Sequence, residues 1–182
     1  MVPEGRLEQT GQGMVPTGDG WFVLNARDAQ WIDRKGRGVY CDFEGELDFP
    51  QLGVNLQVLG PGEPMAMYHR EVDQEDFLVL AGEPLLVIEG QQRSLRPWDF
   101  VHCPPGTNHV IVGSGSVPCV LVAIGAREDS TGPDWGAYTV DETAIRLGAG
   151  LEQETSDQEL AYQRFPSSER TAYREGWLSD QL

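Results

Sequence analysis

The chain has 182 residues, of which 40% are hydrophobic and 23% charged, values that are ordinary for one globular domain of roughly 150 residues with a short extension. No stretch approaches the ~20 consecutive apolar residues that cross a bilayer, so a membrane span is excluded. The 29 acidic and 13 basic residues leave a formal charge of −16, which repels phosphate backbones and anionic lipids, and we expect neither nucleic acid nor a membrane as a partner.

Residues 1–20 are rich in Gly, Pro and Thr and show no apolar periodicity, so they predict a flexible N-terminal arm. They also lack an apolar segment behind a basic one, and therefore do not form a secretory signal. The cysteines Cys41, Cys103 and Cys119 lie far apart without C-x-x-C spacing, which favours reduced, buried thiols. Together these features predict a cytoplasmic protein.

Residues 21–127 are a succession of short apolar segments separated by Gly and Pro. Strands of this length, with a turn signal every eight to twelve residues, are typical of an antiparallel sandwich or barrel. The expected strands are Trp21–Leu24, Val39–Phe43, Val54–Leu59, Met65–Arg70, Asp76–Leu80, Leu85–Glu89, Phe100–Cys103, Val110–Val112 and Val117–Ile124. We therefore predict an all-β domain over residues 21–127.

Residues 128–182 have a different character and predict a loop and two or three short helices. One helix is expected over Asp141–Leu147, with Asp141 as its N-cap, and a second between the capping box at Ser156 and Pro166. A third is expected to follow Ser167 and to end near Gly176. We expect this region to pack on the outside of the barrel, because it carries apolar residues that need cover: Ile145, Leu147, Leu160, Tyr162, Phe165 and Trp177.

Two segments carry residues suited to chemistry. In the first, strand alternation places Met65, Met67, His69 and Glu71 on one face. The next three residues are short enough for a hairpin loop, so Glu75 begins the returning strand and can face the same space. In the second segment, Pro104-Pro105-Gly106 forms a rigid turn just before His109. The two segments together predict a compact set of nitrogen and oxygen ligands.

The spacing of these residues resembles the two motifs of the cupin superfamily over roughly residues 35–126. In the first motif, Gly62 is followed by His69-Arg70-Glu71, then Glu75 and Gly82, with Glu71 where the family usually has a second histidine. In the second, Trp98 replaces the first Gly and Gly113 replaces the last Asn, around Pro104-Pro105-Gly106 and His109. The resemblance implies an antiparallel double-stranded β-helix, or jelly-roll barrel, with metal-binding positions at His69, Glu71, Glu75 and His109.

Two imidazoles and one carboxylate, from His69, His109 and Glu75, match the facial triad of non-haem iron sites, with Glu71 as a fourth ligand or a base beside the metal. Fe, Mn, Zn or Ni fits this donor set as a divalent ion. The alternative is a metal-free polar pocket in which the carboxylates are protonated or solvated. Met65, Met67 and Phe77 are the expected apolar lining, whereas His102 and Cys103 are expected to be structural.

Two functions are compatible with such a site. The first is an enzyme of the oxygenase or isomerase class, in which the metal polarises a small oxygen-bearing substrate or activates water or dioxygen. The second is a non-catalytic module that binds or senses a small molecule, or that serves as an association surface. Small cupins commonly pair, so we also expect a homodimer.

Overall fold

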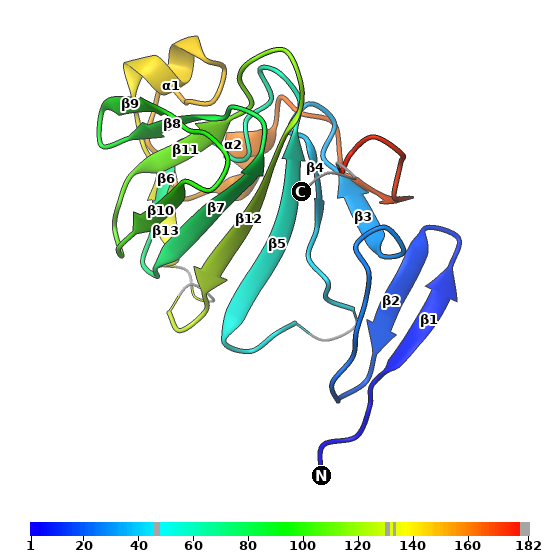
Figure 1. Ribbon diagram of the computed structural model, residues 1–182. Helices are drawn as coiled ribbons and strands as arrows, with labels where there is room; N and C mark the ends of the chain where they lie inside the picture. Colours follow the sequence, from blue (N-terminus) through cyan, green and yellow to red (C-terminus); the bar gives the residue numbers. More distant parts are fainter. Residues whose placement is uncertain (46–47, 130–131, 133, 179–182) are drawn as a thin grey trace.

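The computed structural model describes residues 1–45, 48–129, 132 and 134–178, and it is an antiparallel jelly-roll barrel made of two facing sheets (Figure 1). One sheet has seven strands, in the order β10 (Phe100–Cys103), β7 (Glu75–Ala81), β12 (Cys119–Ala126), β5 (Leu52–Leu59), β4 (Val39–Cys41), β3 (Gln30–Asp33) and β14 (Glu169–Ala172). The other has five, in the order β13 (Gly136–Tyr138), β6 (His69–Glu71), β11 (His109–Val112), β8 (Leu85–Ile88) and β9 (Gln91–Ser94). The predicted all-β class is confirmed.

The core of the barrel lies between the sheets and follows the two-residue period of the strands. Phe77 and Val79 of β7 point inward, as does Ile111 of β11, and all three are almost fully buried. Val110, which precedes Ile111 in β11, points outward and packs under α1 (Glu142–Arg146). The sheets therefore bury apolar side chains on both faces, which leaves polar groups inside the barrel to be explained by function.

The predicted and observed strands differ at two of the predicted segments and at several strands that were not predicted. Trp21–Leu24 is not a strand, since only Trp21 makes an isolated bridge, to Glu4. The segment Met65–Tyr68 is irregular, because its amide groups donate to several different elements, such as Met65 to Ile111 and Tyr68 to Ala149. Strands β3, β9, β13 and β14 were not predicted; β9 is exposed along its whole length and so has no alternation to detect.

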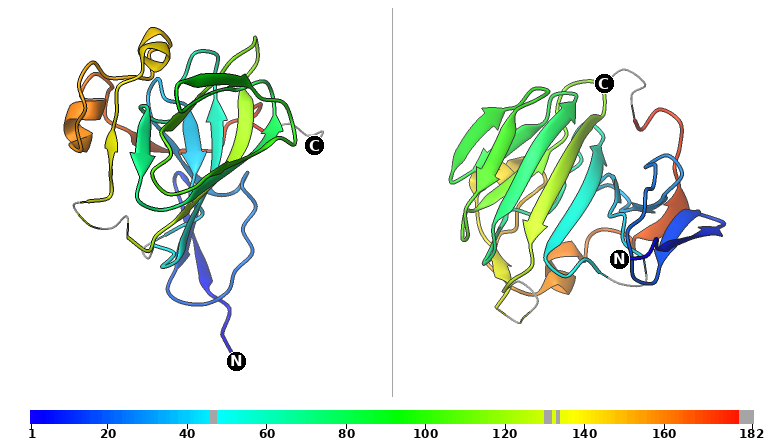
Figure 2. Two further views of the ribbon diagram at one scale, coloured as in Figure 1. Left: turned by 90° about the vertical axis from the view of Figure 1, so that its left-hand side faces the viewer. Right: turned by 60° about the horizontal axis from the view of Figure 1, so that its bottom comes forward.

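The predicted flexible arm contains regular structure, since β1 (Arg6–Thr10) and β2 (Gly13–Thr17) form an antiparallel hairpin. The hairpin projects beyond the barrel in both views of Figure 2. It meets the barrel at Gly13, where a Cβ would lie 2.5 Å from the carbonyl oxygen of Ala29, so only glycine permits this approach. Sequence alone did not predict the hairpin, because its strands offer little apolar alternation.

The C-terminal region forms two of the expected helices. Asp141 caps α1 and Asp157, one residue after the predicted Ser156, caps α2 (Gln158–Tyr162). The third helix was wrong: Glu169–Ala172 is β14, which pairs with the open edge of β3. Because β13 also pairs with β6, this region extends both sheets instead of only covering the barrel. Among the described residues, no helix has the length and apolar character needed to cross a bilayer.

Candidate metal centre

Three side chains converge inside the barrel, and their ligand atoms all lie within 4.8 Å of one another: His69, Glu75 and His109. Glu75 Oε2 is 3.6 Å from His69 Nε2 and 3.3 Å from His109 Nε2. The two histidines are direct partners on β6 and β11 of the five-stranded sheet, whereas Glu75 approaches from β7 of the opposite sheet. The structure therefore brings together three of the four predicted ligands.

The loop between the strands of His69 and Glu75 has a different path from the predicted one. Residues 72–74 do connect β6 to β7, but these strands belong to different sheets, so the expected hairpin is wrong. The loop instead crosses from one sheet to the other, because β6 pairs with β11 and β13 while β7 pairs with β10 and β12. Glu75 still faces His69, since it shares the inner face of β7 with Phe77 and Val79.

The Pro-Pro-Gly turn places His109 as the sequence predicts. The amide of Thr107 donates to the carbonyl of Pro104 at 3.1 Å, and Gly106 has a φ of 82°, which are the features of a type II turn. The amide of Gly106 also donates to the carbonyl of Glu71 at 2.7 Å. This bond ties the turn to β6, so that His109 enters β11 beside His69.

Both imidazoles present the same nitrogen to the centre. His69 Nδ1 lies 2.8 Å from the carbonyl oxygen of Met67, and His109 Nδ1 lies 3.0 Å from that of Thr107. A carbonyl only accepts, so each Nδ1 carries the proton that it donates. In the neutral ring, each Nε2 then has a free lone pair directed at Glu75, which is the arrangement of metal-bound histidines.

The centre contains acceptors without donors. Glu75 Oε2 and His109 Nε2 are buried and have no hydrogen-bond partner. Burying such atoms unsatisfied is costly, and two lone pairs 3.3 Å apart repel each other. A cation between the three side chains would satisfy both atoms, so the residues present fit a divalent metal.

The ionisation of the three groups is shifted by their proximity. Burial lowers the pKa of His69, but interactions with the carboxylates of Glu71 and Glu75 outweigh it and hold the pKa well above its usual value. Burial and the charge of His69 lower the pKa of His109. Burial raises the pKa of Glu75, but the two histidines hold it below its usual value. Without a metal, His69 is therefore the residue of the three that holds a proton most readily.

Glu71 lies beside this centre but outside the group of three. Its Oε1 is 3.7 Å from His69 Nε2, and its side chain is half-buried on β6. The carboxylate lines the same cavity as Glu75. Glu71 is thus close enough to exchange a proton with a molecule held there.

The centre opens into a cavity of about 280 Å³. Met65 and Phe77 line it, as predicted, whereas Met67 instead packs against Tyr138 and Ala161. The prediction for Met67 failed because residues 65–68 are not a strand. The sequence analysis missed most of the polar and aromatic walls, which come from β5, from the turn before β4, and from the C-terminal region: Arg34, Arg37, Asn55, Gln57, Trp135, Tyr138, Gln158 and Tyr162.

The other residues singled out from the sequence do not line this cavity. His102 is exposed on β10 and its Nδ1 lies 2.7 Å from Asp76 Oδ1 on β7. The cysteines are free and buried, and burial raises the pKa of Cys41 and Cys103 to about 12 and that of Cys119 to about 11. Such thiols are poor nucleophiles near neutral pH.

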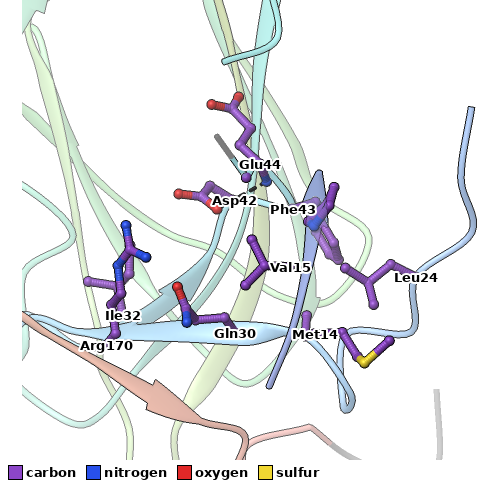
Figure 3. A pocket seen from close by; sticks show the side chains of 12 residues that line it. Met14, Val15, Leu24, Gln30, Ile32, Asp42, Phe43, Glu44 and Arg170 are labelled. Atoms are coloured by element: carbon purple, nitrogen blue, oxygen red, sulfur yellow. Dashed lines mark hydrogen bonds between the residues drawn. The ribbon is translucent and has the colours of Figure 1, made fainter. Parts of the chain in front are cut away.

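A second cavity, of about 160 Å³, lies between the N-terminal hairpin and the barrel (Figure 3). Val15 and Leu24 form part of its apolar wall, and Asp42 and Arg170 lie at its polar side (Figure 3). No histidine lines it, and it includes none of the three converging ligands. We assign this cavity to packing between the hairpin and the barrel.

Comparison with known proteins gives the following likenesses. Residues 55–125 match the family model of the cupin domain. A putative sugar phosphate isomerase from Acidithiobacillus ferrooxidans is 32% identical over 43% of this chain and 52% of its own, with a TM-score of 0.42, so the chain spans about half its length. A sugar phosphate isomerase of the cupin superfamily from Silicibacter pomeroyi is 30% identical over 56% and 62%, with a TM-score of 0.42.

A third solved structure is similar in fold alone. The polyketide cyclase RemF from Streptomyces resistomycificus is 15% identical over 58% of this chain and 79% of its own, with a TM-score of 0.50. A search of the curated proteins found no match. The matched residues 55–125 include all three converging side chains, whereas Arg34, Arg37, Trp135, Tyr138 and Tyr162 lie outside them.

Proposed function

Because residues 55–125 match the model of the cupin domain, we propose that His69, Glu75 and His109 hold one divalent transition metal. This metal serves a reaction on a small oxygen-bearing substrate. The observation that supports this most is the pair of buried, unpartnered ligand atoms, Glu75 Oε2 and His109 Nε2. Fe, Mn, Zn and Ni are the candidates, since each accepts imidazole and carboxylate ligands. The reaction belongs to the oxygenase or isomerase class.

A metal bound there would supply Lewis acidity and open coordination positions for a substrate oxygen or for dioxygen. The chain's own residues do the rest. The Nδ1 bonds to Met67 and Thr107 keep both rings oriented. Glu71 is not one of the three proposed ligands, and its carboxylate lines the cavity with Oε1 3.7 Å from His69 Nε2. Glu71 is therefore the residue that takes a proton from the substrate.

The direct test is metal loading of the full chain. We expect chelator-treated protein to take up about one ion per chain of at least one candidate metal, and its melting temperature to rise by about 5–10 °C at 100-fold excess over Kd. Elemental analysis and differential scanning calorimetry measure the two effects. Calcium serves as the control, since it takes six to eight oxygen ligands and is poorly matched by two imidazoles. Failure of all four metals to bind would contradict the proposal.

Metal affinity is also expected to depend on pH. His69 holds a proton in the metal-free protein, because its pKa is raised, and Nε2 must lose that proton before it binds a metal. The affinity should therefore rise about tenfold per pH unit until the pH exceeds the pKa of His69. Calorimetry in two buffers of different ionisation heat should detect about one proton released per metal. An affinity that stays constant between about pH 6 and pH 8 would contradict the assignment of the proton to His69.

Turnover separates an enzyme from a binding module. Iron-loaded protein is incubated with catechols, thiols and keto acids, and dioxygen consumption and product formation are measured. A reaction that is lost in Glu71→Gln while the metal is retained supports the catalytic role of Glu71. Tight binding without turnover across the panel would favour the sensing module.

The homodimer and the cytoplasmic location stay predictions.

A further inference from the structure

Two arginines reach the same cavity from one turn. Arg34 and Arg37 lie between β3 and β4, in a turn closed by the bond from the Arg34 amide to the carbonyl of Gly38 at 3.1 Å. Gly38 has a φ of 71°, and a Cβ there would lie 2.3 Å from the carbonyl oxygen of Val58, so the turn depends on glycine. Both arginine side chains line the cavity that holds His69 and Glu75.

Arg34 is held in place by neutral groups only. Arg34 is 8% exposed. Its guanidinium donates to the carbonyl of Met65 at 2.8 Å and to Gln57 Oε1 at 2.7 Å. Its Nε is buried without a partner. Burial and then the charge of Arg37 lower the pKa of Arg34 to about 10, and this repulsion outweighs the attraction of Glu63. Among the described residues, Arg34 therefore has no carboxylate in direct contact, although its buried charge would be stabilised by one.

Arg37 has even fewer polar contacts. Its guanidinium stacks on Tyr162, with Cζ 4.1 Å from the ring centroid, and lies 5.3 Å from the ring centroid of Phe165. Within the described part of the chain, no hydrogen bond or ion pair joins Arg37 to another side chain, and its Nε is buried without a partner. Stacking fixes the plane of the guanidinium and leaves its N–H groups for something that the protein itself does not supply.

From these contacts we propose that Arg34 and Arg37 bind the anionic group of the substrate, a carboxylate or a phosphate, and that Arg37 makes the direct contact. The inference rests on the proposed function, in which an oxygen atom at the other end of the same substrate binds the metal. A planar guanidinium presents paired donors that match both kinds of anion. The two arginines lie outside residues 55–125, the part of the chain that matches the family model.

The charges in the cavity agree with this assignment. Arg34 and Arg37 balance Glu71 and Glu75, so a divalent metal leaves the cavity positive by about two charges, enough to receive a dianion. The chain as a whole carries −16 and repels anions at long range. Selective binding of an anion therefore has to come from local groups, and Arg34 and Arg37 are the only arginine or lysine residues among the described residues that line the cavity.

The test uses Arg37→Gln in the full-length protein, both metal-loaded and chelator-treated. Inorganic phosphate and malonate are the probes, so that the two kinds of anion are distinguished, and calorimetry measures their affinity. We expect Arg37→Gln to weaken the preferred anion about 10–100-fold in both states, while metal content stays unchanged. Arg37→Lys should lose less, because it keeps the charge but not the paired donors. Arg93→Gln, on the exposed strand β9, is the matched control and should bind like the parent.

The outcomes separate the two proposals. If Arg37→Gln loses anion affinity but the parent protein binds none of the metals, the result contradicts the metal centre alone. Unchanged anion affinity in Arg37→Gln, with metal still bound, would overturn the arginine proposal alone. If Arg37→Gln unfolds, the parent protein decides: malonate must bind at least about tenfold more tightly than its neutral isostere malonamide, and the proposal fails if the two bind equally.

Discussion

Replacing His109 with Ala is expected to remove the metal. The side chain is 1% exposed, and its Nε2 faces Glu75 Oε2 at 3.3 Å with no other partner. Removal of a residue that only orients a ligand already costs about 10–100-fold in metal affinity, so loss of a ligand should cost at least about 100-fold. The same loss is expected for His69→Ala. Elemental analysis after dialysis against a trace of chelator measures both variants beside the parent.

His102→Ala is the matched control for these variants. His102 comes from the same short segment but is exposed on the outer face, where it contacts Asp76. We expect it to retain full metal content and to change stability by less than about 0.5 kcal/mol. Full metal retention in the double variant lacking both His69 and His109 would rule out this centre. Circular dichroism shows whether each variant is folded, so that loss of metal is not confused with loss of structure.

Trp31→Ala is expected to destabilise the fold by about 3–5 kcal/mol, the range for removing a large buried aromatic side chain. Trp31 is fully buried on the outer face of the seven-stranded sheet. Its ring centroid lies 5.2 Å from that of Trp177 and 6.1 Å from that of Tyr173, and its Nε1 donates to the carbonyl of Ala26 at 2.8 Å. The substitution would leave both a cavity and an unpaired carbonyl. Urea denaturation followed by circular dichroism measures the change in unfolding free energy.

Trp98→Ala removes the same side chain from an exposed position, since Trp98 is 66% exposed. Its effect should be within about 0.5 kcal/mol. Folded Trp31→Ala protein should still bind metal, because Trp31 lies on the opposite face of the sheet from the centre. Equal destabilisation by the two substitutions would contradict the packing of residues 173–178 against this face.

Local patterns were sufficient to place the three residues of the candidate metal centre, although the loop between His69 and Glu75 is not the predicted hairpin. The period of β7 placed Glu75 on the inner face, and the Pro-Pro-Gly turn placed His109 at the start of β11. The same reasoning failed where the backbone left the regular pattern, so Met67 was assigned to the wrong environment. It also failed for β14, where a segment without strong alternation is held by the free edge of β3.

The sequence by itself determined the class of fold and the three converging ligands, because alternation, turn residues and ligand spacing are encoded over a few neighbouring positions. Only the tertiary structure decided which other residues face the candidate metal centre. Arg34 and Arg37 lie far along the chain from Tyr162, yet one cavity contains all three. Their meeting depends on how β13 and α2 pack against the barrel, which no local pattern specifies. Short sequence motifs thus specify the residues of the candidate centre, whereas the candidate substrate preference depends on long-range packing.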